Sequence, residues 1–544
     1  MRLSFFAAAL AGISVTGVLA AQTAEPDFSA ERVRAHVEFL ADDMLEGRNA
    51  GERGYDIAAK YVATRFQALG LKPAAAGSWY QQVPFLEYGL ADAPATVTIG
   101  GRAFRNREDV ILSGSEAETQ QSVEAPVVFA GYGLDAPSAG FNDYEGLDVR
   151  GKIVAVLSGF PRGTPSEMGA HLSSEKRRMA DRHGAVGMVT ILTRADEDRR
   201  PWARRVQMAG SSNMTWIGTD GRPYSAAPGI RVGATLGRAA AEALFAGGKR
   251  PLEAVLAEAD RQGGKPKGFA LKPRLKVDRQ SVNRRLTSPN VVAVLPGSDP
   301  ALANEYVLLM AHLDHDGLDP KLEGDKIYNG AMDNAAGTAT MLEVARAMAT
   351  APVRPRRSIL FAAVTAEEDG LLGSEYLAKH PVVDGKIAGV VNLDMPILLY
   401  DFSDVIAFGS EHSTLGPIVA RAAAGMNVAL SPDPLPQEGL FTRSDHYKFV
   451  REGIPSVFLM TGFAGEGEKQ FKDFLATHYH KPSDEPDLPF NWNAGAKFAR
   501  LNYLIAREIA NSDTAPLWYG DSFFGRMMAP AAPKAQRPTR TGQK

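Results

Sequence analysis

The second half of the sequence alternates short apolar runs with longer segments that have the residue spacing of helices. The apolar runs are nearly continuous, as expected for strands that are buried on both faces of a sheet. They lie at residues 291–295, 306–310, 358–364, 390–393, 405–408 and 456–460. This alternation predicts an α/β fold with a doubly wound, mostly parallel sheet flanked by helices. Sheets of this kind bind ligands at the carboxyl ends of their strands.

Histidine and acidic residues directly follow several of these runs. They are His312, Asp314, Glu367, Glu368 and Asp394. Each residue alone has an ordinary explanation as a helix cap, a turn residue or a solvated charge. Their shared position at strand ends is harder to explain in that way. Because the chain contains no cysteine, histidine and carboxylates at this edge predict a hard or borderline metal such as zinc.

Length and composition exclude several classes of protein. A chain of 544 residues is too long for one ordinary core and predicts two or three domains. The formal net charge of -3 gives no indication of a nucleic-acid-binding surface. The absence of cysteine excludes disulfides, thiolate zinc sites and cysteine nucleophiles.

Residues 1–21 have the pattern of a secretory signal peptide. Arg2 precedes an apolar segment at residues 5–19, and the small residues Ala20 and Ala21 offer cleavage sites. The apolar segment is short for a membrane span, and no later segment is long and apolar enough to cross a bilayer. We therefore expect a periplasmic or secreted protein without stable membrane insertion.

The patterns divide the rest of the chain into four parts. Residues 28–85 begin with two amphipathic helices. Residues 86–282 contain short strands separated by glycine, proline and aspartate, which predicts an inserted β-rich domain. Residues 283–515 hold the predicted α/β domain. Residues 529–544 are rich in proline, alanine and basic residues, and this tail is predicted to be disordered.

Five motifs in this order are similar to those of the M28 family of zinc aminopeptidases. The motifs are Ala311-His312-Leu313-Asp314, Asp333-Asn334-Ala335-Ala336-Gly337, Ala366-Glu367-Glu368, Asn392-Leu393-Asp394 and Tyr479-His480-Lys481-Pro482-Ser483-Asp484. The resemblance covers residues 290–511 and extends to the helices at residues 28–71, which would pack on the same domain. Residues 143–154 resemble a protease-associated domain, which commonly interrupts members of this family. The resemblance therefore implies a zinc-peptidase fold with an inserted protease-associated domain.

The resemblance also implies a centre with two zinc ions. Asp333 would bridge the two ions. His312 and Asp394 would complete one site. Glu368 and His480 would complete the other. Two metals about 3.5–4 Å apart can activate one water molecule and hold the scissile carbonyl oxygen.

The same resemblance assigns roles to residues beside the ligands. Glu367 would be the general base that takes a proton from water and passes it to the leaving amine. The carboxylate of Asp314 would accept a hydrogen bond from the far nitrogen of His312. The family often has a cis peptide bond after its bridging aspartate, which is here the bond between Asp333 and Asn334.

The motifs leave a choice between neighbouring histidines. His478 competes with His480 for the ligand role, and the motif favours His480. His315 is not expected to be a ligand. A further polar stretch is predicted to support the ligands or to line the substrate pocket, and a structural role is equally open for its last two residues. Its residues are Arg443, Asp445 and His446.

The expected reaction is hydrolysis of the N-terminal peptide bond of peptides by an exported di-zinc metallopeptidase. Carboxypeptidases on the same scaffold need cationic groups for the substrate carboxylate, and Arg443 is a candidate for one of them. Glutaminyl cyclases tend to use one zinc ion, whereas the ligand set here suits two. A non-catalytic binding protein with a peptidase fold is a further alternative, although such proteins usually lack metal ligands or the base.

Overall fold

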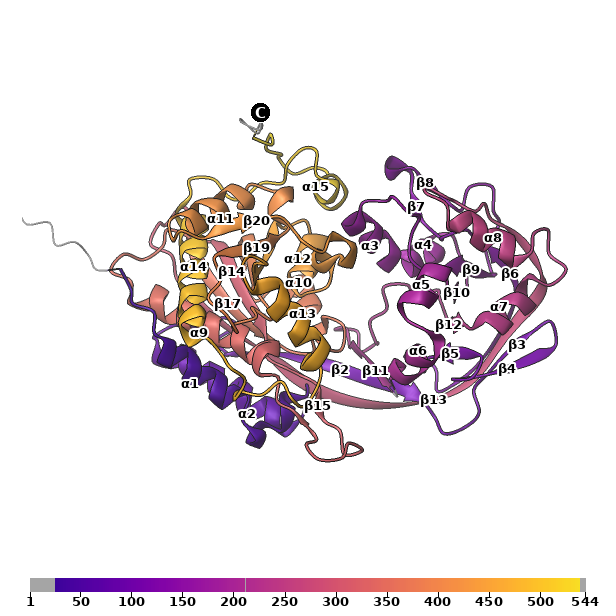
Figure 1. The fold of residues 1–544 in the computed structure, drawn as a ribbon, viewed down its shortest axis with the longest axis horizontal. Coiled ribbons are helices and arrows are strands. Elements are labelled where there is room, and N and C mark those ends of the chain that lie inside the picture. The colour runs from indigo at the N-terminus through magenta and orange to yellow at the C-terminus, as the bar shows by residue number, and fades with distance from the viewer. Residues whose placement is uncertain (1–24, 211, 539–544) are drawn as a thin grey trace, which may run out of the picture.

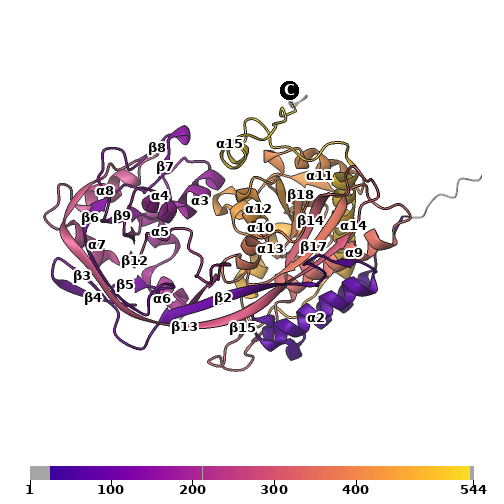
Figure 2. The same cartoon turned by 180° about the vertical axis from the view of Figure 1, so that it is seen from behind.

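Two lobes form the part of the chain described by the computed structural model, which is residues 25–210 and 212–538 (Figure 1). The first lobe combines the N-terminal helices with the C-terminal half of the chain. The second lobe is the segment between them, and the long strands β2 and β13 run from one lobe towards the other (Figure 2). The predicted signal peptide at residues 1–21 lies outside the described residues.

The first lobe is a sheet covered by helices on both faces. Its strands are β1 (Lys72–Pro73), β2 (Tyr80–Leu90), β13 (Phe269–Leu295), β14 (Glu305–His312), β17 (Ser358–Val364), β18 (Lys386–Leu393), β19 (Asp404–Phe408), β20 (Ala429–Ser431) and β21 (Ser456–Thr461). Its helices are α1 (Ala30–Leu40), α2 (Arg53–Ala68), α9 (Ala336–Thr350), α10 (Leu372–Lys379), α11 (Leu415–Ala424), α12 (His446–Arg451), α13 (Gly467–Thr477), α14 (Trp492–Asn511) and α15 (Phe523–Met528). Among the described residues, no helix combines the length and apolarity that a membrane span requires.

The strands of this sheet follow the order β2–β13–β17–β14–β18–β21–β19–β20. The central strands β17, β14, β18 and β21 are parallel, whereas β13 is antiparallel to β17 and β19 is antiparallel to β21. The predicted α/β fold with a mostly parallel sheet is therefore confirmed.

Side chains of the central strands alternate between two cores, which explains the continuous apolar runs. In β14, Val307 and Leu309 share a core with residues of α1, α2, α9 and α14. Leu308 and Met310, which point to the opposite face, pack with residues of α10 and α12. All four side chains are fully buried. Burial of each such side chain contributes about 1.5–3 kcal/mol, so both layers of helices are held by the same strands.

The sequence of helix α1 accounts for where the helix begins and for which face it buries in this core. The side chain of Ser29 accepts a hydrogen bond from the backbone N–H of Arg32 and caps the first turn. Val33, Val37 and Leu40 follow at the spacing of one helical face and are fully buried. Their face packs against α9 and α14.

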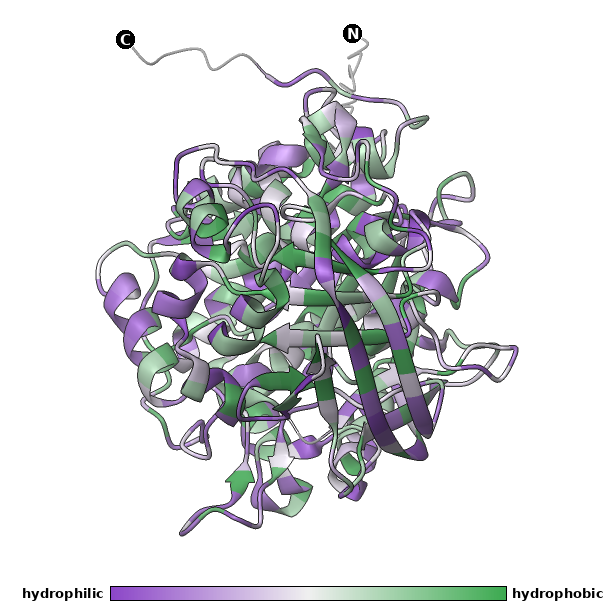
Figure 3. Cartoon of the chain, turned by 90° about the vertical axis from the view of Figure 1, so that its right-hand side faces the viewer, coloured by the Kyte–Doolittle hydropathy of each residue, from purple (hydrophilic) through white to green (hydrophobic). Residues whose placement is uncertain are grey.

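The second lobe has its own sheet and its own core. The sheet order is β4–β3–β13–β6–β9–β10–β12–β5. Its strands besides β13 are β3 (Thr96–Ile99), β4 (Arg102–Arg105), β5 (Val110–Leu112), β6 (Gln120–Phe129), β9 (Ile153–Leu157), β10 (Gly187–Ile191) and β12 (Val232–Leu236), and its helices include α3 (Ser166–Ser174), α4 (Lys176–Arg182), α7 (Arg238–Phe245) and α8 (Leu252–Ala259). Hydrophobic residues gather in the central strands, while hydrophilic residues dominate the outer helices and loops (Figure 3).

Strand β13 runs through the boundary that the sequence predicted near residue 282. Its first part pairs with β3 and β6 in the second lobe, and its continuation from Ser281 pairs with β2 in the first lobe. One strand of 27 residues therefore belongs to both sheets, and its pairing changes from β6 to β2 between Gln280 and Ser281. The pairing partners on both sides satisfy its backbone groups.

The predicted disordered tail is wrong for residues 529–538. The backbone N–H of Ala535 donates to the carbonyl of Trp518, and Arg537 forms an ion pair with Asp521. Composition indicates only that a segment lacks apolar residues, and here polar partners on the first lobe bind the basic segment.

Candidate metal centre and active site

Five side chains with imidazole or carboxylate groups converge at the carboxyl edge of the first-lobe sheet. His312 ends β14, Glu368 follows β17 and Asp394 follows β18. Asp333 lies in the turn before α9, and His480 follows α13. The structure therefore brings together all five residues that the sequence predicted as metal ligands.

The two oxygens of Asp333 face different partners. Oδ1 lies 3.2 Å from Nε2 of His312, and the same nitrogen lies 3.3 Å from Oδ1 of Asp394. Oδ2 of Asp333 lies 3.4 Å from Nε2 of His480, which is 3.3 Å from Oε2 of Glu368. Asp333 therefore stands between two groups, each of which contains one histidine and one further carboxylate.

These separations fit zinc. Ligand atoms at 2.0–2.1 Å from a tetrahedral zinc ion are about 3.3 Å apart, which is longer than most hydrogen bonds. Although burial alone would raise the pKa of Asp333, the neighbouring imidazoles His312 and His480 hold that pKa well below its usual range. The carboxylate is thus charged, and nitrogen and oxygen donors without thiolates suit zinc.

Hydrogen bonds fix the turn that presents Asp333. The carboxylate of Asp484 accepts from the backbone N–H groups of Met332 and Asp333 at 2.9 and 3.0 Å. The side chain of Asn334 donates to the carbonyl of Leu393 and accepts from the N–H of Gly337. The peptide bond between Asp333 and Asn334 is cis, as the resemblance implied.

Glu367 lies beside the cluster and lines a cavity. One oxygen each of Glu367 and Glu368 and one ring nitrogen of His312 lie within 4.8 Å of one another. Ala366 adopts a left-handed φ of 53° just before the pair. Burial, together with the nearby carboxylates of Glu368 and Asp394, raises the pKa of Glu367 well above its usual range. A carboxylate of raised pKa binds a proton more strongly than an ordinary carboxylate, which suits a group that takes up and passes on a proton.

The cavity has a volume of about 340 Å³ and a largely apolar wall opposite the cluster. The apolar residues of the wall are Met395, Leu440, Phe458, Met460, Phe471 and Leu475. Arg443, which the sequence predicted near the substrate pocket, and Tyr479 also line the cavity. Asp445 and His446 are fully buried at the start of α12 and do not line the cavity, because the helix turns both side chains into the protein interior.

The family model for peptidase family M28 matches residues 290–506. That segment contains the central strands and all five clustered residues. The chain carries a peptidase family M28 domain. Leupeptin-inactivating enzyme 1 of Streptomyces exfoliatus is 31% identical over 186 residues, which are 32% of this chain and 36% of that protein. A probable leucine aminopeptidase 2 of Aspergillus oryzae is 32% identical over 203 residues, which are 35% of this chain and 36% of that protein.

These matches cover part of each protein. The chain spans about a third of the length of these two curated relatives. A solved aminopeptidase from Aneurinibacillus sp. strain AM-1 resembles the fold over 90% of this chain and 95% of that one, with a TM-score of 0.51 and 21% identity. The likeness in fold therefore extends beyond the M28 domain into the second lobe.

Two residues that the sequence did not assign orient the ligands of the M28 domain. Nδ1 of His480 lies 3.2 Å from Oδ2 of Asp316, which leaves Nε2 directed at Asp333. Nδ1 of His315 lies 2.7 Å from Oε1 of Glu368 and holds the second oxygen of that carboxylate. Both lie next to the first motif, and their adjacency to His312 was the available signal. His478 is half-buried, and its ring is hydrogen-bonded to the carbonyl of Ser483.

The role expected for the carboxylate of Asp314 is wrong in one respect. The acceptor beside Nδ1 of His312 is the backbone carbonyl of Asp314, at 3.2 Å. The carboxylate instead accepts from the backbone N–H of Glu368 at 3.2 Å and ties the loop after β17 to the loop after β14. The tautomer of His312 is therefore set by a main-chain acceptor, and its Nε2 still faces the cluster.

Ser444 supports Asp394 and was missed by the sequence analysis. Its hydroxyl donates to Oδ2 of Asp394 at 2.5 Å and accepts from the amide of Asn392 at 2.7 Å. Ser444 lies between Arg443 and Asp445 in the polar stretch named above. The serine, which contacts a ligand-type carboxylate directly, is the member of that stretch that reaches the cluster.

Arg48 links three segments beneath the cluster of the M28 domain. It is 1% exposed, and its guanidinium donates to the carbonyls of Leu313, Asn329 and Gly330 at 2.9, 2.5 and 3.0 Å. It also donates to the carbonyl of Leu40 at the end of α1. Burial lowers the pKa of Arg48 to about 10, so it remains charged at neutral pH. The loops that present His312 and Asp333 are therefore tied to the N-terminal helices.

Replacing Arg48 by methionine is expected to destabilise the protein by about 3–5 kcal/mol. The substitution leaves several buried carbonyl groups without a donor, and each unsatisfied group costs about 1–3 kcal/mol. Equilibrium unfolding in urea measures the change. The matched control is Arg53→Met, since the side chain of Arg53 is 72% exposed. Equal unfolding midpoints for the two variants would contradict this role of Arg48.

Proposed function

We propose that the chain is an exported di-zinc metallopeptidase that hydrolyses the N-terminal peptide bond of peptides. The observation that carries the proposal is the position of Asp333, whose two oxygens face separate histidine–carboxylate pairs. The similarity of the chain to proteins named as aminopeptidases supports it. Export rests on the signal-peptide pattern at residues 1–21.

His312 and Asp394 would hold one zinc ion, and Glu368 and His480 would hold the other, with Asp333 between them. Bound zinc lowers the pKa of water and polarises a substrate carbonyl. The turn around Asp333 is fixed by Asp484 and Asn334, so the ligands are oriented before a metal arrives.

Glu367 would move the proton in this reaction. Its carboxyl group faces the cavity beside His312 and has a raised pKa. We propose that it takes a proton from the attacking water and delivers that proton to the nitrogen of the leaving amine. Proton transfer by a positioned side chain contributes about 10²- to 10⁴-fold to the rate of such reactions.

The cavity offers few cationic side chains to a substrate carboxylate. Arg443 is the one arginine among the described residues that line it, and three of the four carboxylates there would bind zinc. The side chain of Arg443 is 54% exposed and lies 3.9 Å from a carboxylate oxygen of Glu438. This weakens the carboxypeptidase alternative. The two-sided position of Asp333 weakens the single-zinc cyclase alternative, and the presence of Glu367 weakens the non-catalytic alternative.

The apolar wall of the cavity predicts which N-terminal residues are accepted. Leucine, methionine and phenylalanine p-nitroanilides are expected to be hydrolysed about 10- to 200-fold more efficiently than the aspartate and lysine compounds, in kcat/KM. Charged side chains would lose their hydration against this wall. The assay uses periplasmic extract or culture medium from cells that express the full chain. N-acetylated substrates serve as controls, and their hydrolysis at the same rate would contradict an aminopeptidase.

A further inference from the structure

Helix α3 of the second lobe lies on the side that faces the first lobe (Figure 1), and its side chains make polar contacts with that lobe. Glu167, His171 and Glu175 lie at intervals of four residues, which places them on the same side of the helix. Glu167 contacts the turn at Ser410–His412 of the M28 domain, and His171 and Glu175 contact helix α12. This regular spacing indicates a docking face rather than three unrelated contacts.

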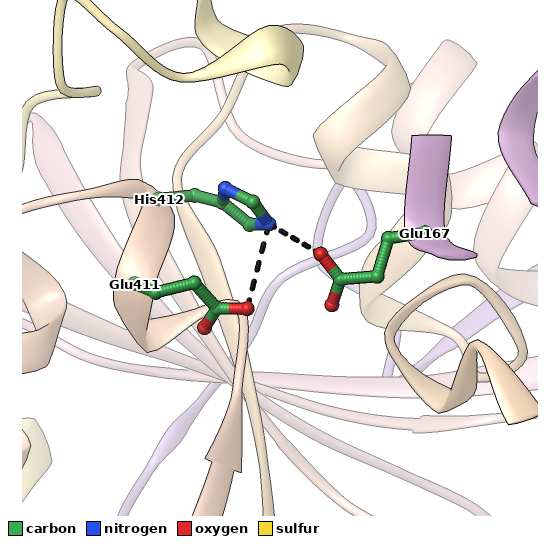
Figure 4. A group of neighbouring side chains, drawn as sticks. All are labelled: Glu167, Glu411 and His412. Atoms are coloured by element: carbon green, nitrogen blue, oxygen red, sulfur yellow. Dashed lines mark hydrogen bonds and ion pairs between the residues drawn. The ribbon is translucent and has the colours of Figure 1, made fainter. Parts of the chain in front are cut away.

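The contacts of this face are hydrogen bonds and ion pairs. Nε2 of His412 donates to Oε2 of Glu167 at 2.7 Å, and Figure 4 shows the two side chains directed at each other. The hydroxyl of Tyr447 is hydrogen-bonded to Nδ1 of His171. Beyond the end of the helix, Oε1 of Glu175 lies 2.9 Å from Nη2 of Arg451.

These groups are shielded from water, unlike most surface ion pairs. The side chains of Glu167 and His412 are 17% and 13% exposed, and His171 is 3% exposed. Exposed ion pairs contribute little to stability, but the loss of water around these groups strengthens their attraction. The contacts are therefore able to fix the position of α3 on the first lobe.

A loop of the substrate pocket lies directly against α3. It contains two short helical turns, Pro436–Glu438 and Leu440–Thr442, and both contact α3. Gly439 joins the turns with a φ of 59°, and a Cβ atom there would lie 3.1 Å from Cβ of Ala170. The helix and the loop thus approach as closely as their backbones allow.

Phe441 connects the contacts of α3 to the pocket. It is fully buried, with its ring centroid 5.2 Å from that of His412 and 6.1 Å from that of Tyr447. These two rings are the partners of Glu167 and His171. Leu440, the neighbour of Phe441, lines the cavity, as does Arg443.

We propose that α3 positions the wall of the substrate pocket, so that the second lobe takes part in selecting the N-terminal side chain of the substrate. Glu167 and His171 are positioning residues that act through His412 and Tyr447 on Phe441, and through it on Leu440. This inference rests on the proposed function and deepens it. None of these four polar residues lines the cavity or contacts the five ligand-type side chains.

The kinetic test compares His171→Phe, Tyr447→Phe and the double variant. Phenylalanine preserves the contacts of His171 with the rings of Phe523 and Phe524 but removes the hydrogen bond. We expect KM for leucine p-nitroanilide to rise on the order of 10-fold in each single variant, the effect of about one hydrogen bond. The double variant should show no additional rise, because both substitutions remove the same contact.

Alanine p-nitroanilide is the matched substrate, because its methyl group offers little surface for contact with an apolar wall. Its KM and the zinc content of each variant are expected to stay within about twofold of the wild type. Glu242→Ala is the control variant, since its side chain lies on α7 and is 64% exposed. An unchanged ratio of KM for the leucine and alanine substrates would overturn the inference, whether both KM values stay the same or both rise by the same factor.

Hydrogen exchange tests the positioning role without using activity. Peptides that cover residues 436–443 should exchange faster in Glu167→Ala and His171→Phe than in the wild type, and Glu167→Gln should restore part of the protection. Unchanged exchange would overturn the inference even in an active enzyme. Faster exchange in a protein whose wild type hydrolyses no substrate would support the positioning role and contradict the proposed function, so the two failures are distinguishable.

Discussion

Replacing Glu367 by glutamine is expected to lower kcat by about 10²- to 10⁴-fold while the zinc content stays the same. Glutamine has nearly the same shape but cannot take up the proton. Because Glu367 is not one of the side chains that surround the oxygens of Asp333, metal binding should not depend on it. Steady-state kinetics with leucine p-nitroanilide and metal analysis of the same sample measure both quantities.

The control for this variant is Asp473→Asn. Asp473 lies on α13, its side chain is 56% exposed, and it does not line the cavity. Its substitution should change kcat by less than about threefold, because exposed groups away from the reacting atoms have small effects. If Glu367→Gln retains more than a tenth of the wild-type kcat, another group moves the proton.

Replacing Asp333 by asparagine is expected to abolish the two-metal centre. The amide of asparagine lacks the negative charge with which the Asp333 carboxylate would bind both zinc ions. Even changes in the outer partners of metal ligands lower metal affinity by about 10- to 100-fold. We expect at least a 100-fold loss of zinc affinity and turnover below detection. Zinc that binds only the folded state stabilises it, and the stabilisation is larger when zinc binds more tightly. The rise in melting temperature on zinc addition should therefore disappear as well.

The matched control for Asp333→Asn is Glu323→Gln, an exposed substitution ten residues earlier. It should bind zinc and gain thermal stability like the wild type. Isothermal titration of each apoprotein with zinc gives stoichiometry and affinity together. Wild-type affinity at two sites in Asp333→Asn would rule out a bridging role for this carboxylate.

The fold could be predicted where the signal is local. Strands such as β14 and β17 are buried on both faces, so their apolar runs identify them directly. Strand β13 was recognised only in its last residues, 291–295. Its first part alternates apolar residues with charged ones, and its partners β3 and β6 lie far away in the sequence. Pairing with distant strands, rather than local composition, decides that this segment is a strand.

The candidate site was predictable for residues that carry the chemistry and not for those that support it. His312 and Glu368 follow strands in recognisable motifs. Arg48 acts through backbone carbonyls, and 265 positions separate it from Leu313. A backbone acceptor leaves no trace in the sequence at its own position. The carbonyl of Asp314 replaced the expected carboxylate at His312 for the same reason.

Titration of the chelator-treated protein with zinc, followed by hydrolysis of leucine p-nitroanilide, tests the two-metal aminopeptidase most directly. We predict no hydrolysis without metal, recovery as zinc is added, and maximal activity at two equivalents per chain. The N-acetylated substrate should stay intact throughout. Maximal activity at one equivalent would contradict the two-metal centre, and no hydrolysis at any ratio would contradict the aminopeptidase itself.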